Sequence, residues 1–244
     1  MSANDAILAK IRAILAKAED RAATPEEAET YFAKAAALMS KYGVERAMLA
    51  EVDPSTDKPS TRTITVKGSY LLDRVQLLNS ITNALGGQAV RWRAYDGESG
   101  KYVQRVELHA YESTLDRVEM LYTSLLLQVF NGMRQSRPAW GESTTAYRKS
   151  WLAGFSQSVY KRLMNAEELA AAQATNDHGG RSAELVLASR EDTILAQFKA
   201  AHPRVRIAKR RLTGSGWSEG KAAGQRADLG GTRVSSGRRQ AVSA

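Results

Sequence analysis

The sequence predicts an α+β protein, in which an N-terminal helical hairpin precedes a mixed domain with a small, mainly antiparallel sheet packed by long helices. Two patterns lead to this class. Apolar residues recur every three to four positions over residues 113–133, which is typical of the buried face of a helix. Residues 61–67, 88–95 and 101–109 alternate in polarity and are rich in β-branched and aromatic side chains, as strands are.

Composition indicates an ordinary globular chain, since 43% of the 244 residues are apolar and 25% are charged. Cysteine is absent, which excludes disulfides, thiolate metal ligands and a cysteine nucleophile. Charged residues interrupt both the N-terminal apolar pattern and the 113–133 helix, so neither fits a signal peptide or a membrane span. We therefore expect a cytoplasmic protein with no membrane partner.

Two helices are predicted to form the N-terminal hairpin. The first covers residues 5–18, where apolar positions follow helical spacing. The second covers residues 25–42, because Thr24 begins a Thr-x-x-Glu capping box and a proline follows it. Gly43 is expected to end this helix in a left-handed conformation, and a short third helix is expected over residues 44–51.

The hairpin resembles the bacterial and phage family catalogued as domain of unknown function 2786, over roughly residues 5–50. The resemblance is most specific at the lysine-alanine end of the first helix, at TPEEA (24–28) and at KAAALMSKYG (34–43). The later segments VEMLYTSLLLQV, YRKSWLAGFSQSVYKRL and SGWSEGKAAGQRADLG resemble the region that accompanies this module. The family has no established activity, so the resemblance implies a fold and boundaries but no site residues.

Proline, serine and aspartate in residues 54–60 predict a linker, which divides the chain into domains. Residues 1–53 would form the hairpin module and residues 61–234 the α+β domain. Residues 235–244 are expected to be a disordered tail.

Further elements follow from the same patterns. In chain order they are a strand at 61–67, a helix at 69–85, a β-hairpin at 88–95 and 101–109, helices at 113–133 and 143–172, a loop at 174–182, a strand at 183–189, a helix at 191–202, a basic strand or extended arm at 204–212 and a helix at 216–230. In the last helix Gly216, Gly220 and Gly224 recur every four residues and share one face. Since glycine costs a helix ~1 kcal/mol, we expect a close backbone neighbour there.

Nearly all of the net charge of +9 lies in residues 181–244, which carry 13 basic and 5 acidic groups. We therefore predict an accessory protein that binds DNA or RNA non-specifically through this quarter of the chain. Trp92 and Trp217 could stack on bases, although core burial is the expected role of both. The predicted contact residues are Arg204, Arg206, Lys209, Arg210, Arg211, Lys221 and Arg226.

Three alternatives to nucleic-acid binding stay open. The basic stretch could be a solvated edge strand. The protein could be an adaptor that meets a protein partner through its N-terminal hairpin. It could also be an enzyme with a loop site at Asp177 and His178.

No metal site, cofactor or catalytic residue is assigned. His109, His178 and His202 lie far apart without the spacing of zinc ligands. The glycine-rich run GSGWSEG does not have the spacing of a phosphate-binding loop.

Overall fold

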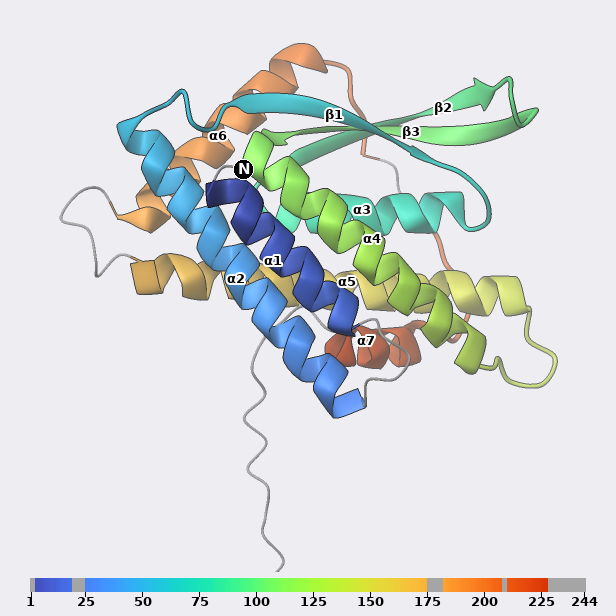
Figure 1. Ribbon diagram of the computed structural model, residues 1–244. Coiled ribbons are helices and arrows are strands. Elements are labelled where there is room, and N and C mark those ends of the chain that lie inside the picture. Colours follow the sequence, from blue (N-terminus) through green and yellow to red (C-terminus); the bar gives the residue numbers. More distant parts are fainter. Residues whose placement is uncertain (1–2, 19–24, 175–181, 208–209, 228–244) are drawn as a thin grey trace, which may run out of the picture.

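A computed structural model describes residues 3–18, 25–174, 182–207 and 210–227, and it confirms the α+β class (Figure 1). The elements in chain order are α1 (Ala3–Ala18), α2 (Pro25–Val52), β1 (Pro59–Val66), α3 (Leu71–Ala84), β2 (Gln88–Asp96), β3 (Lys101–Tyr111), α4 (Glu112–Gln135), α5 (Thr144–Ala174), α6 (Ala183–Ala201) and α7 (Trp217–Arg226).

The sheet is antiparallel with the order β1-β3-β2, so β3 lies in the centre. Side chains alternate between its two faces. Val66, Val106 and Leu108 belong to the hydrophobic core, which α3 and α4 complete on this side. Thr61 and Thr63 of β1 point to the opposite face and are exposed, as their alternation predicts. We call this second face the open face.

Helix α4 is the central helix that the apolar spacing predicts. Leu115, Val118, Leu125 and Val129 lie fully inside the core. Helices α5 and α7 form the layers farthest from the sheet (Figure 1). Trp151 of α5 is buried in the same core, so helices and sheet share one apolar interior.

The close approach predicted for the glycine face of α7 is confirmed. A Cβ on Gly220 would overlap the carbonyl oxygen of Trp151 in α5. A Cβ on Gly224 would lie 2.7 Å from the carbonyl oxygen of Phe155, one turn further along α5. The two backbones are in contact, which only glycine permits.

Gly43 does not end a helix, contrary to the prediction. Helix α2 continues through it to Val52 and includes the predicted third helix. The guanidinium group of Arg117 in α4 occupies the space that a Cβ at position 43 would need. Glycine is therefore favoured here by the position of a neighbouring side chain and not by backbone conformation.

The strand predicted at residues 183–189 is also wrong, because these residues begin α6. Ser182 caps this helix by accepting a hydrogen bond from the backbone N–H of Leu185. Ala183, Val186, Ile194 and Phe198 are the buried positions, and their separations of three, eight and four residues are helical. The segment is too short for its alternating letters to distinguish a strand from the first turns of a helix.

Part of the predicted linker is structured. Pro59 and Ser60 belong to β1. Asp57 is buried, accepts hydrogen bonds from the backbone N–H of Ser113 at 3.1 Å and from its hydroxyl at 2.7 Å, and forms an ion pair with Arg190. Residues on both sides of the linker share one core, and the division into domains stays a prediction.

Several predictions fall on residues outside the described ranges: the capping box at Thr24, the loop with Asp177 and His178, Lys209, and the tail at 235–244. Within the described ranges, no helix has the length and apolarity needed to cross a membrane.

Candidate functional site

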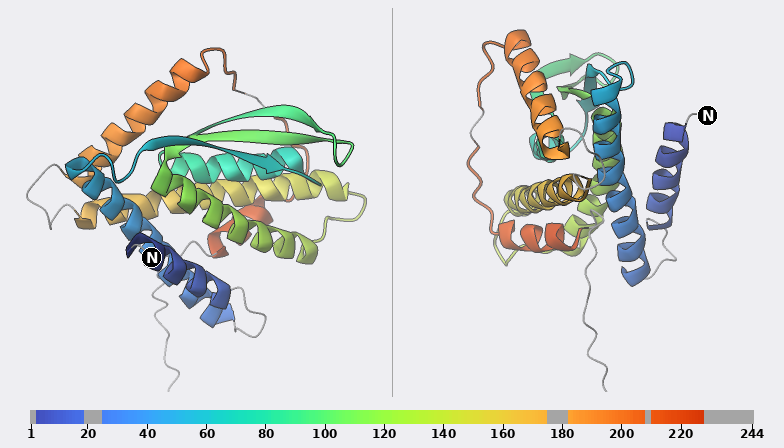
Figure 2. Two further views of the ribbon diagram at one scale, coloured as in Figure 1. Left: turned by 45° about the horizontal axis from the view of Figure 1, so that its top comes forward. Right: turned by 90° about the vertical axis from the view of Figure 1, so that its left-hand side faces the viewer.

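We call residues 204–211 the basic segment. Its described residues, 204–207 and 210–211, lie between α6 and α7 in the chain and on the side of the molecule away from α1 and α2 (Figure 2). The positions described in it are not in a strand. Arg204, Arg206 and Arg211 are exposed, and within the described part of the chain none of them forms an ion pair. Three guanidinium groups therefore face solvent without a carboxylate partner among the described residues.

The other predicted contact residues are placed differently. Arg210 donates a hydrogen bond to the buried carboxylate of Asp73 in α3 at 2.7 Å, which fastens the segment to the core. Lys221 and Arg226 lie on α7, and the Lys221 ammonium group lies 5.3 Å from the ring centre of Trp217. The predicted residues thus form an exposed group on the segment and a second pair on α7.

Both tryptophans that were expected in the core are instead partly exposed: Trp92 is 39% exposed and Trp217 is 40% exposed. Trp92 on β2 pairs across the strands with Arg105, so both project from the open face. Val90 lies two residues before Trp92 on the same face and lines a shallow groove with Arg204. The aromatic and basic part of the sheet therefore adjoins the basic segment.

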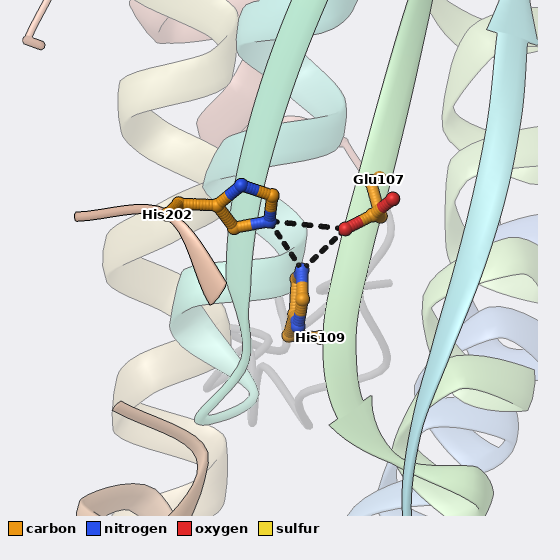
Figure 3. A group of neighbouring side chains, drawn as sticks. All are labelled: Glu107, His109 and His202. Atoms are coloured by element: carbon orange, nitrogen blue, oxygen red, sulfur yellow. Dashed lines mark hydrogen bonds and ion pairs between the residues drawn. The ribbon is translucent and has the colours of Figure 1, made fainter. Parts of the chain in front are cut away.

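A second cluster on the open face brings together Glu107, His109 and His202 (Figure 3). Glu107 and His109 lie two positions apart on β3 and so project from the same face. His202 directly follows α6, where its backbone N–H donates to the carbonyl oxygen of Phe198 at 2.9 Å. Its Nε2 lies within hydrogen-bond distance of His109, a residue 93 positions earlier in the chain.

The three polar atoms of this cluster form a nearly equilateral triangle. Nε2 of His109 lies 2.8 Å from Oε1 of Glu107, and Nε2 of His202 lies 3.0 Å from each of the other two atoms. His109 is buried, whereas the side chains of Glu107 and His202 are 28% and 25% exposed. The cluster is thus anchored in the protein and open to solvent on one side.

Phe198 of α6 orients both imidazole rings. Its ring centre lies 5.2 Å from that of His109 and 5.1 Å from that of His202. The groove of about 280 Å³ begins beside His202 and is also lined by Ala201, Pro203 and Val205. A small molecule in the groove would lie next to the cluster.

Sequence reasoning missed this cluster. Its only local signal was the Glu-x-His pair on a predicted strand, which places two side chains on one face. The third member depends on α6 crossing that face, and the start of α6 was predicted to be a strand.

Comparison with known proteins extends only to the N-terminal region. A family model described as a protein of unknown function (DUF2786) matches residues 6–46, which confirms the resemblance over α1 and most of α2. No curated protein and no solved structure matches the chain. The match brings no activity with it, so function must be argued from the chain's own residues.

Proposed function

We propose that the protein is a cytoplasmic accessory protein that binds nucleic acid non-specifically through the basic segment and the adjoining part of the open face. The observation that supports this most directly is that Arg204, Arg206 and Arg211 are exposed and have no ion-pair partner in the described part of the chain. Phosphate neutralisation requires exposed cations but no particular order of residues. These three side chains meet that requirement.

The sheet supplies a surface that single strands favour. Trp92 and Arg105 are exposed side by side on the open face, and Arg204 lines the groove beside them. Bases stack on aromatic rings regardless of sequence, at ~1–3 kcal/mol per base. We therefore propose that single-stranded DNA or RNA binds more tightly than duplex.

The remaining predicted residues contribute to this proposal in different ways. Arg210 holds the segment in place through Asp73 and acts on binding indirectly. Lys221 and Arg226 on α7 would extend the contact for a longer strand, together with Lys209.

The test is a pair of triple variants with equal loss of charge. The first variant combines Arg204→Ala, Arg206→Ala and Arg211→Ala and so lacks the three exposed guanidinium groups. The second variant is the control and combines Lys10→Ala, Lys34→Ala and Lys41→Ala. These exposed lysines belong to α1 and α2, on the other side of the molecule (Figure 2). Binding to labelled single strands and duplexes would be measured by fluorescence anisotropy at several salt concentrations.

The arginine variant should bind at least ~10-fold more weakly than wild type at low salt, and the lysine variant within ~3-fold of it. Equal losses in both variants would mean that only net charge matters. No binding by folded wild-type protein at low salt would remove the proposal in favour of a protein-protein adaptor that docks through α1 and α2.

A further inference from the structure

We propose that Glu107, His109 and His202 bind one first-row divalent transition-metal ion, with zinc as the expected occupant. This replaces the sequence-based expectation that no metal site is present. The inference does not depend on nucleic-acid binding, because it rests on a different set of side chains. Its basis is the mutual arrangement of three ligand atoms (Figure 3).

Protons alone leave at least one of the three contacts in this arrangement unfavourable. Each imidazole Nε2 has a single position in the ring plane, which holds either a hydrogen or a lone pair. If both nitrogens carry hydrogen, both can donate to Oε1 of Glu107, but the two donors then lie 3.0 Å apart with no acceptor between them. If only one does, the lone pair of the other nitrogen faces the carboxylate oxygen of Glu107 with no hydrogen between them. A cation between three lone pairs makes all three contacts favourable at once.

The dimensions suit a small ion. An atom at zinc–nitrogen distance, ~2.0–2.1 Å from each corner of the triangle, would lie ~1 Å out of the plane of the three atoms. All three protein ligands would then be on one side of the ion. The other side stays open for water or a substrate atom, as in catalytic zinc sites built from two histidines and one carboxylate.

The ligands are also held in place before any ion binds. Glu107 and His109 lie on the central strand, where backbone hydrogen bonds on both sides fix their positions. Phe198 packs against both imidazole rings. An ion would join β3 to the end of α6 and should stabilise the folded chain. Bound water beside the groove would be acidified, which is the chemistry that such an ion supplies.

The direct test uses the full-length protein, stripped with a chelator and dialysed. Zinc titration by calorimetry should give one ion per chain with a Kd below ~1 µM. At a free zinc concentration 100-fold above Kd, the Tm should rise by ~5–10 °C. Cobalt(II) should produce the intense visible absorption of a four-coordinate site.

Three variants locate the site. His202→Gln is the first choice because this side chain is partly exposed at a helix end, so the fold should survive. His202→Gln, His109→Gln and Glu107→Gln should each weaken zinc binding at least ~100-fold, since loss of an outer-shell partner alone costs 10- to 100-fold. His178→Gln is the matched control and should bind as wild type does.

Circular dichroism would verify that each variant is folded. Folded wild-type protein that binds no zinc would overturn the inference. So would binding that is unchanged in both His202→Gln and His109→Gln, or reduced to the same extent in His178→Gln, because the ion would then lie elsewhere.

Discussion

At the scale of single residues, glycines set how closely the helices approach. Gly220 of α7 lies against the backbone of Trp151, and Gly43 of α2 lies beneath the guanidinium group of Arg117. Arg117 is itself buried and forms an ion pair with Glu167 of α5, which also accepts a hydrogen bond from Ser40 at 2.8 Å. One missing side chain in α2 thus permits a polar connection among three helices.

Gly220→Ala is expected to destabilise the protein by ~1–3 kcal/mol, because the added methyl group meets backbone atoms that cannot move aside. Helix propensity alone predicts the opposite, a gain of up to ~1 kcal/mol. Urea denaturation would measure the difference. Gly97→Ala is the control, since a Cβ there meets no atom within 4 Å. A stabilised Gly220→Ala protein would show that α7 does not pack against α5 as described.

Asp57 is a second residue whose role is structural. Its carboxylate is buried, accepts two hydrogen bonds from Ser113 at the start of α4 and pairs with Arg190 of α6. Asp57→Asn should cost ~3 kcal/mol, because it leaves a largely buried guanidinium without its counter-charge. Asp53→Asn, an exposed turn residue nearby, should have a much smaller effect in the same denaturation assay. Equal effects would contradict the linking role of Asp57.

At the scale of elements, α5 and α7 are also joined by polar contacts. Tyr147 of α5 donates a hydrogen bond to the Glu219 carboxylate of α7 at 2.5 Å. Burial and this neighbouring carboxylate raise the pKa of Tyr147 from 10.0 to about 12. The folded protein therefore holds the phenol proton at pH values where the unfolded chain has lost it.

This shift predicts how stability depends on alkaline pH. The contribution of Tyr147 is complete below pH 10 and is lost as pH rises through about 12, since the folded state binds more protons in that window. The Tyr147→Phe variant should be less stable than wild type at neutral pH. As the pH rises above 10, its stability should fall less than that of wild type. Thermal unfolding of both proteins between pH 8 and 12 would measure this, and parallel curves would contradict it.

The elements differ in how far the sequence could predict them. Helix α4, the sheet and the glycine face of α7 were predictable because each depends on periodicity within one segment. The end of α2 was not predictable from Gly43. This glycine makes room for the side chain of Arg117, a residue 74 positions later in the sequence. The start of α6 was ambiguous because a short apolar run such as residues 183–189 is compatible with either a strand or a helix. The helix that ends at His202 was predicted over residues 191–202, but the contact of His202 with Glu107 and His109 is a tertiary contact that no pattern within one segment predicts.

At the scale of the whole molecule, charge is divided between two sides. The sequence of residues 1–60 has 8 basic and 10 acidic groups, and it contains the α1 and α2 hairpin. The basic segment lies on the other side of the molecule (Figure 2). Such a separation orients a polyanion toward one face before contact. The open face, with its aromatic residue and its histidine cluster, adjoins the basic side.

The measurement that tests the nucleic-acid proposal most directly is the salt dependence of single-strand binding by wild type and by the Arg204, Arg206 and Arg211 triple-alanine variant. A plot of log Kobs against log salt falls by ~0.7 per phosphate contact for single strands. If each arginine neutralises one phosphate, the slope of the variant should be shallower by ~2. Equal slopes, or a wild-type affinity that does not change with salt, would show that nucleic acid is not bound by the basic segment.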